Sequence, residues 1–298
     1  VTGMGALTPV GNTAEESWEN LKAGKSGAAP ITHFDASQFK TQFACEVKGF
    51  DANAFIDRKE QRKMDIYTQF AIAAAKMAIA DSGMDLEAVD KNEIGVVLGV
   101  GIGGIKTFED EAGNYALNGP ELGPKFNPFF IPKMIADIAA GQIAIDYGFH
   151  GPNYTTTSAC ASSSNALADA FNLIRLGKAN AMITGGSEAA ICAVGVGGFN
   201  AMKALSTRND DAEKASRPFS ASRDGFIIGE GAGILVLEEL EHAKARGAKI
   251  YAEMVGAGMS ADAYHITASH PEGLGAKLVM ERALKDAGMK PEVIDYIN

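Results

Sequence analysis

The chain has 298 residues, of which 46% are hydrophobic and 21% charged. It can therefore bury a large core and should form one large or two medium domains. A net charge of −10 and a pI near 5.1 disfavour nucleic acid or an anionic membrane as a general partner. Nothing in Val1–Gly5 reads as a signal peptide, and no run of about eighteen apolar residues could span a bilayer. We expect a cytoplasmic protein with no membrane insertion.

The predicted elements alternate in the α/β manner. A short strand at Val1–Thr2 comes first, and a capping-box pattern at Thr13–Glu16 starts a helix that ends at Gly24. A long helix follows over 58–81, and the apolar run 94–100 is typical of a strand buried on both faces. Further helices are predicted over 132–147, with Pro132 at its first position, 238–246 and 274–287, and strands over 181–184, 227–237, 250–255 and 294–298. Because the chain stops within an apolar strand, we expect a fragment.

The segment around Cys160 is the most informative. An extended polar run, 153–158, leads into the small residues 159–165 and then into an apolar helical pattern that ends at Gly177. Cys160 should therefore lie where a strand turns into a helix, and the N-terminus of that helix favours a thiolate. A lone cysteine among small residues is more often a packing element, but this setting resembles the nucleophile turn of hydrolases.

The remaining motifs exclude several kinds of site. The three cysteines, Cys45, Cys160 and Cys192, are odd in number and have no C-x-x-C spacing, so we expect free thiols and no structural zinc. Thr2–Gly5 suggests a dinucleotide-binding turn, but Thr8 stands where the third glycine is needed. We expect no metal and no cofactor.

A basic run breaks the acidic balance of the chain. In Arg58–Lys63, the pairs Arg58/Arg62 and Lys59/Lys63 would share one face of a helix at i, i+4. This run is either an ordinary solvated face or a docking site for an acidic partner.

Several motifs together resemble one family. Thr157–Ser163 resembles the active-site segment of the β-ketoacyl-acyl-carrier-protein synthases. The segments 195–199, 204–210, 216–219 and 223–233 look like the elongating type II enzymes of that family in particular, and the likeness runs from Val1 to Asn298.

The resemblance implies a thiolase-like layered α-β-α-β-α fold built from two similar halves, and a homodimer. Residues 1–247 would be the N-terminal condensing half, complete apart from the start of its first strand, and residues 248–298 the start of an incomplete C-terminal half. The family's two catalytic histidines, a lysine and a phenylalanine would all lie beyond Asn298, and none of the five histidines present matches them. We therefore expect the intact enzyme to condense and residues 1–298 alone to be poorly folded or inactive.

The implied reaction is a decarboxylative condensation of malonyl-carrier protein with an acyl chain first transferred to Cys160. The backbone N–H of Cys160 would belong to the oxyanion hole. The resemblance also assigns roles to other residues: Ile102 and Phe199 to the acyl pocket, Asp262, His265 and Thr267 to a gating loop, and Arg62, Lys63, Lys125 and Lys203 to docking of the acyl carrier protein.

Three other functions compete with this one. A polyketide-type ketosynthase has a similar cysteine segment. A chain-length-determining partner subunit would be non-catalytic, but such a subunit has lost the nucleophile, whereas Cys160 is present. A nucleotide-dependent oxidoreductase ranks third, because its glycine motif is incomplete.

Overall fold

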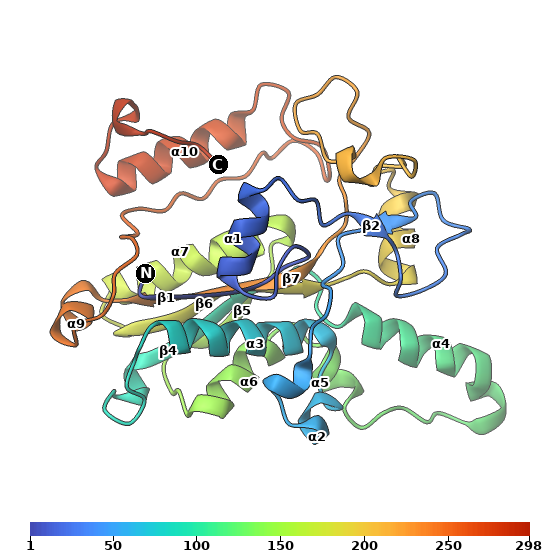
Figure 1. Ribbon diagram of the computed structural model, residues 1–298, viewed down its shortest axis with the longest axis horizontal. Helices are drawn as coiled ribbons and strands as arrows, with labels where there is room; N and C mark the ends of the chain where they lie inside the picture. Colours follow the sequence, from blue (N-terminus) through green and yellow to red (C-terminus); the bar gives the residue numbers. More distant parts are fainter. The chain divides into compact units, whose positions relative to one another are not determined.

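A mixed sheet of five strands forms the centre of the larger of two units. The computed structural model describes residues 1–298, which divide into Thr2–Ile250 and a second unit of Tyr251–Asn298 together with Val1. The strand order is β1-β7-β6-β4-β5 (Figure 1). The strands are β1 (Gly3–Leu7), β4 (Ile94–Gly99), β5 (Asn153–Thr156), β6 (Ala181–Ala189) and β7 (Glu230–Glu238).

Three of these strands are parallel. β4 pairs in parallel with both β5 and β6, whereas β7 is antiparallel to β6 and to β1. Every residue of β4 is buried, as the apolar run predicts. The carboxyl ends of β4, β5 and β6 therefore meet at one edge of the sheet.

Helices cover both faces of this sheet. α3 (Ile66–Asp81) and α6 (Ile138–Tyr147) lie on one face, and α7 (Ser162–Arg175) lies on the other (Figure 1). Ten residues of α3 are buried, five of them alanines, and its backbone approaches β1 so closely that a Cβ at Gly5 would overlap the carbonyl oxygen of Ala74. Burial on both faces makes this sheet the core that positions the loops at its edge.

The other elements are short or peripheral. The remaining helices are α1 (Ala14–Lys22), α2 (Arg58–Gln61), α4 (Ile105–Leu122), α5 (Phe130–Met134), α8 (Ala193–Ala201), α9 (Leu240–Ala245) and, in the second unit, α10 (Leu274–Ala287). A two-stranded sheet joins β2 (Ala29–Pro30) to β3 (Phe43–Ala44). Five 3₁₀ turns are η1 (Ala52–Ala54), η2 (Lys91–Glu93), η3 (Ala159–Ala161), η4 (Ala212–Lys214) and η5 (Pro291–Val293). None of the helices combines the length and the hydropathy needed to cross a bilayer.

Several predicted helix ends are confirmed. The Thr13 hydroxyl accepts a hydrogen bond from the Glu16 N–H at the start of α1, and Gly24 has a left-handed backbone after its end. Gly177 closes α7 with a φ of 65°, and the next residue, Lys178, donates to the carbonyl of Leu173 in a Schellman motif. α10 has the predicted bounds.

Two predicted long helices are each broken in two. The helix expected over 58–81 is α2 followed by α3, because the Asp65 carboxylate caps a new helix by accepting the N–H of Tyr67. The helix expected over 132–147 is α5 followed by α6, because the backbone is extended at Ile135. Pro132 is the third residue of α5, still within the first turn, where its missing N–H breaks no helical bond.

The strand predictions also need correction. The first strand runs over 3–7 rather than 1–2, β6 continues to Ala189, and β7 begins at Glu230 rather than at 227. Residues 250–255 and 294–298 form no strand. Val1 bonds with the N–H of Tyr251 and the carbonyl of Ala252, but no ladder of strand pairing extends from these bonds, and residues 294–298 belong to no strand pair.

Candidate active site

Cys160 lies in an exposed turn at the carboxyl edge of the sheet. It is the central residue of η3, which comes after β5 and leads directly into α7, so its predicted position between strand and helix is confirmed. The side chain is exposed to solvent. Ala159, just before it, has a φ of 51°, a left-handed conformation that costs energy for a residue with a Cβ.

Side-chain hydrogen bonds hold this strained turn in place. The Ser162 hydroxyl donates to the carbonyl of Ala159 at 2.7 Å and accepts the N–H of Ser158 at 2.9 Å. The Thr156 hydroxyl donates to the carbonyl of Ser162 at 2.8 Å, and the Asn165 amide donates to the Ser158 hydroxyl at 2.6 Å. The polar residues around Cys160 therefore fix the backbone and leave the thiol free to react.

Two glycines allow α7 to begin directly on the sheet. A Cβ at Gly99, the last residue of β4, would overlap the backbone between Ser162 and Ser163. A Cβ at Gly186 on β6 would overlap the Ser163 hydroxyl. The sheet thus presents bare backbone where the nucleophile turn lies.

The Ile102 turn follows β4 at the same edge. The Ile102 side chain is 44% exposed, and Gly103 after it has a φ of 83°. The Glu188 carboxylate on β6 accepts the N–H of Ile102 at 2.8 Å and the N–H of Gly103 at 3.0 Å. Burial raises the pKa of Glu188 and the nearby Asp65 adds to the rise, whereas these backbone hydrogen bonds oppose it.

Glu188 was not singled out from the sequence. Its signal is an acidic residue two positions after Gly185–Gly186, where the strand was predicted to have ended at residue 184. Because β6 continues to Ala189, the carboxylate is carried within a buried strand.

Phe199 lies on α8 and packs against an apolar cluster. Its ring meets that of Phe226 edge to face, with centroids 5.5 Å apart. The cluster also contacts Ile105, the first residue of α4, just after the Ile102 turn. The structure thus brings the start of α4 and Phe199 to one cluster, which fits both a pocket lining and plain packing.

The four predicted docking cations do not all lie together. Arg62 is exposed at the end of α2, and Lys63 pairs with Glu60 at 2.6 Å and lies over the Phe129 ring, 5.8 Å from its centroid. Lys125 is exposed in the loop between α4 and α5. Lys203, with a φ of 56°, follows α8, which lies apart from α2 and α5 in Figure 1. The predicted i, i+4 basic face is wrong, because α2 ends at Gln61.

The predicted gating loop belongs to the second unit. Asp262 accepts the N–H of Gly275 at 3.1 Å and that of His270 at 3.2 Å. The His265 ring nitrogen accepts the N–H of Thr267 at 3.1 Å. These local bonds give the loop a defined conformation, and its gating role stays a prediction.

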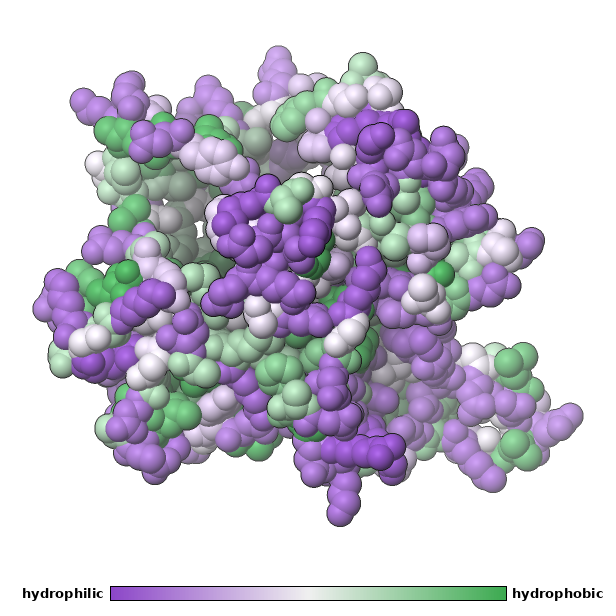
Figure 2. Space-filling model, in the orientation of Figure 1, coloured by the Kyte–Doolittle hydropathy of each residue, from purple (hydrophilic) through white to green (hydrophobic).

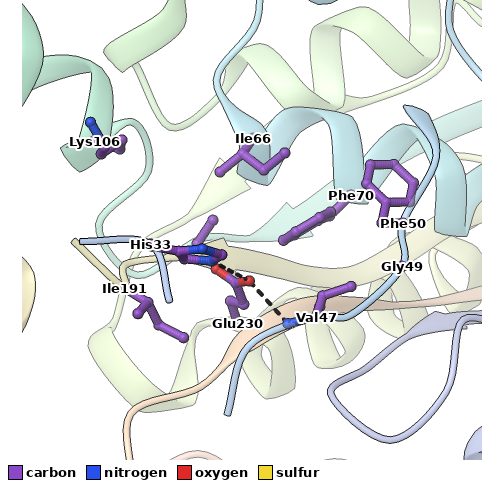
Figure 3. Close-up of a pocket in the computed structure, with 10 residues that line it drawn as sticks. His33, Val47, Gly49, Phe50, Ile66, Phe70, Lys106, Ile191 and Glu230 are labelled. Atoms are coloured by element: carbon purple, nitrogen blue, oxygen red, sulfur yellow. Dashed lines mark hydrogen bonds and ion pairs between the residues drawn. The ribbon is translucent and has the colours of Figure 1, made fainter. Parts of the chain in front are cut away.

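A second candidate site is a cavity of about 460 Å³ between the N-terminal part of α3 and β7 (Figure 3). His33 points toward Glu230 there, with 3.0 Å between Nε2 and Oε1, and the same oxygen accepts the N–H of Val47. The hydrogen bond to Glu230 raises the pKa of His33. Lys106 at the rim is paired with Asp110. These charges satisfy one another and offer no nucleophile, so the Cys160 turn is the better candidate.

The other two cysteines are less exposed than Cys160. Burial raises the pKa of Cys45, and burial raises that of Cys192 to about 11. Cys192 Sγ accepts the N–H of Gly195 at the start of α8. No disulfide joins any of the three, and no cluster of three His, Cys, Asp or Glu side chains is placed to hold a metal.

Comparison with known families gives two matches along the chain. Residues 1–243 match the family model described as "Beta-ketoacyl synthase, N-terminal domain". Residues 251–298 match "Beta-ketoacyl synthase, C-terminal domain".

Individual relatives agree with these matches. A "3-oxoacyl-[acyl-carrier-protein] synthase 2" of Synechocystis sp. is 52% identical over 298 residues, which cover all of this chain and 71% of that protein. A crystal structure of a β-ketoacyl synthase from Burkholderia phymatum is 34% identical with a TM-score of 0.88, covering 99% of this chain and 72% of that one. A type II polyketide ketosynthase, solved in complex with its acyl-carrier protein, is 33% identical with a TM-score of 0.89, covering all of this chain and 72% of that one. With an exposed cysteine at a strand-to-helix turn of a fold shared with these ketosynthases, the chain belongs to the β-ketoacyl synthase family.

Proposed function

We propose that this protein is a β-ketoacyl-acyl-carrier-protein synthase of fatty acid chain elongation, an acyltransferase that uses Cys160 as its nucleophile. The observation that carries the proposal is the exposed thiol in a strained turn, pinned by hydrogen bonds, in a chain 52% identical to a 3-oxoacyl-acyl-carrier-protein synthase. Two chemical steps follow from it.

The first step moves the acyl chain onto the protein. The Cys160 thiolate attacks the thioester carbonyl of an acyl-carrier protein, and collapse of the tetrahedral intermediate expels the carrier thiolate, which takes up a proton. The developing oxyanion needs fixed donors, and the N–H of Cys160 lies within the 3₁₀ turn η3, which leads into α7. The product is a thioester on Cys160.

The second step forms the new carbon–carbon bond. Malonyl-carrier protein loses carbon dioxide, and the electron pair of the broken bond leaves an enolate at the carbon next to its thioester. That carbon attacks the acyl carbonyl on Cys160, the sulfur leaves as thiolate, and a 3-oxoacyl-carrier protein departs. The thiolate is thereby restored, so one cysteine serves both steps.

The acyl carrier protein is the proposed partner. A related ketosynthase has been solved in complex with such a carrier. Arg62, Lys63 and Lys125 lie on or near α2 and the loop before α5, and Lys203 follows α8. The cations near α2 and α5 would steer an acidic carrier protein toward that part of a chain with a net charge of −10, and Lys203 would contribute a separate contact.

A second copy of this chain is the other proposed partner. β5 is an edge strand that pairs only with β4, and Tyr154 on it is 37% exposed. Helix α4 also exposes large apolar side chains, and green surface is visible over its outer end in Figure 2. An unpaired strand edge and an exposed apolar helix are each typical of surfaces that a homodimer covers.

The alternatives fit less well. The polyketide ketosynthase structure is 33% identical, whereas the fatty acid relative is 52% identical. A non-catalytic chain-length subunit has no use for the pinned turn around an exposed Cys160.

The proposal is tested by supplying a carrier protein loaded with an acyl chain and a second one loaded with labelled malonyl. The release of carbon dioxide and of 3-oxoacyl product is then followed. We expect both products with the intact wild-type enzyme, none with its Cys160→Ala variant, and wild-type rates with its Cys45→Ala variant as the matched control. Product formation by the Cys160→Ala variant would overturn the proposal.

A further inference from the structure

A largely buried carboxylate stands behind the Ile102 turn. We propose that Glu188 is a positioning residue that fixes this turn and thereby sets which acyl-chain lengths the site accepts. The inference rests on the proposed function, because only an acyl-transferring enzyme would bring an acyl chain into contact with Ile102. Four observations about the segment carry it.

The first observation is the bonding of the turn. One Glu188 oxygen, Oε2, accepts the N–H of Ile102 at 2.8 Å, and the other, Oε1, accepts that of Gly103 at 3.0 Å. The N–H of Gly101 also favours the charged carboxylate. Two successive backbone donors, those of Ile102 and Gly103, thus converge on one side chain, and hydrogen bonds to a charged acceptor are among the stronger ones in proteins.

The second observation is a matching anchor at the other end. The Asp65 carboxylate, 3% exposed, accepts both the N–H of Thr107 at 3.0 Å and its hydroxyl. The segment between Gly101 and Thr107 is therefore hydrogen-bonded to two carboxylates, one on β6 and one at the start of α3. A segment fixed at both ends has little freedom to move Ile102 unless one anchor is lost.

The third observation is the proximity of the nucleophile turn. A Cβ placed on Gly101 would be 2.6 Å from Glu188 Oε2 and 3.6 Å from the carbonyl oxygen of Ala159. Glu188, the Ile102 turn and the residue before Cys160 therefore share one corner of the sheet edge. A shift of the turn would move Ile102 relative to the thiol.

The fourth observation concerns the charge of the anchor. Burial raises the pKa of Glu188, and the Asp65 carboxylate adds to that rise. Protonation would convert one acceptor oxygen into a donor, which cannot face a backbone N–H. The turn is thus sensitive to the charge of this one group.

These features give the carboxylate a role beyond folding. Ile102 is a branched apolar side chain, 44% exposed, on a turn whose glycines supply no packing of their own. An acyl chain that enters beside it gains or loses apolar contact with each added methylene, which is worth about tenfold or more in discrimination. A change in the position of the turn would therefore alter which acyl-chain lengths react fastest, and would leave the chemical step at Cys160 unchanged.

The test compares Glu188→Gln with wild type in two measurements. The first is hydrogen exchange of the Ile102 and Gly103 amides, which we expect to speed up in the variant. The second is the rate of acyl transfer to Cys160 from a long-chain and a short-chain acyl-carrier protein. We expect the ratio of the two rates, and with it the KM for the long chain, to change by about tenfold.

Two further variants sharpen the result. Glu46→Gln is the matched control, because Glu46 is also buried and accepts backbone N–H groups of Thr32 and His33, away from the turn. It should leave the ratio unchanged. Gly101→Ala perturbs the same contact from the loop side, so it should change the ratio in the same direction as Glu188→Gln and serves if the latter fails to fold.

The outcomes separate the two proposals. Slow exchange of the two amides in Glu188→Gln, or fast exchange with an unchanged ratio of rates, would overturn this inference while acyl transfer to Cys160 upheld the proposed function. Failure of the wild-type protein to accept any acyl chain on Cys160 would overturn the proposed function and this inference with it.

Discussion

Two regions of the same sheet differ in how their buried charges and backbone strain are compensated. At the carboxyl end of β4 and β6, glycines leave the backbone bare, Ala159 is strained and Glu188 is only partly compensated for its burial. At the β1–β7 edge, the fully buried Glu238 accepts two bonds from the Arg246 guanidinium, both 2.7 Å, and a third from the Thr2 hydroxyl.

The difference separates residues that serve chemistry from residues that serve stability. Burial opposes ionisation of Glu238, but its hydrogen bonds outweigh burial and lower its pKa, whereas for Glu188 burial prevails and raises it. Strain and incompletely compensated charge gather where the molecule is proposed to act, and complete pairing is found away from that site.

The largest expected effect is at Cys160. Cys160→Ala removes the nucleophile and should lower acyl transfer by about 1000-fold or more, while the free energy of unfolding changes little because the side chain is exposed. Stopped-flow acylation and denaturant unfolding measure the two quantities. A large loss of stability in this variant would break the comparison, since it would make Cys160 a packing residue.

The next effect concerns the bare backbone beneath α7. Gly99→Ala places a Cβ on the backbone of Ser162 and Ser163, and should lower the free energy of unfolding by about 3 kcal/mol and slow acylation of Cys160. Gly233→Ala, on β7 of the same sheet with open space around the new Cβ, is the control and should change stability by less than about 1 kcal/mol. Equal effects of the two substitutions would contradict the proposed role of close packing.

A smaller effect is expected at the paired edge. Arg246→Ala removes two hydrogen bonds to buried Glu238 and should cost about 2 kcal/mol of stability with no change in acyl transfer. Because the folded-state pKa of Glu238 is lowered, its contribution is present above the ordinary value of 4.5 and is lost as the pH falls through the folded-state pKa. The difference in the free energy of unfolding between wild type and Arg246→Ala should therefore become smaller as the pH is lowered.

The control for that experiment lies on α9, the helix that ends just before Arg246. Lys244 forms a surface pair with Glu241 at 2.9 Å, and Lys244→Ala should cost about 0.5 kcal/mol or less. If the loss of stability in Arg246→Ala stays the same as the pH is lowered, then its bonds to Glu238 are not the source of the stability that Arg246 contributes.

The smallest effect is a pH dependence at the cavity of Figure 3. The hydrogen bond to Glu230 raises the pKa of His33, with Glu46 also raising it and with burial and Lys106 opposing. Its stabilising contribution is therefore present below the ordinary value of 6.5 and is lost as the pH rises through the folded-state pKa. His33→Gln should destabilise more at about pH 6 than at about pH 9, and this difference should vanish in a Glu230→Gln background.

Local signals explain which parts of the molecule could be predicted from the sequence. Three predictions depend only on consecutive residues, and all three are found in the structure: the buried strand within 94–100, the helix cap at Thr13–Glu16 and the strand-to-helix change at Cys160. Asp65 and Glu188 could not be assigned in the same way. Their partners lie 42 and 86 residues distant in the chain, so only the folded sheet brings them to the segment they hold.

The same reasoning accounts for the errors. Residues 250–255 and 294–298 have strand-like composition, but a strand exists only with a partner, and composition does not specify one. The helix expected over 58–81 was divided by Asp65, whose preference for a cap outweighs the helical pattern around it.

The most direct test of the central claim uses the three cysteines as one internal comparison. The intact enzyme is incubated with a carrier protein that bears an acyl chain and is then digested, and the acyl group is located by mass spectrometry on Cys45, Cys160 or Cys192. The account predicts the label on Cys160 alone, since it is the exposed thiol and burial raises the pKa of the other two. A label on Cys45 or Cys192, with Cys160 unmodified, would contradict it.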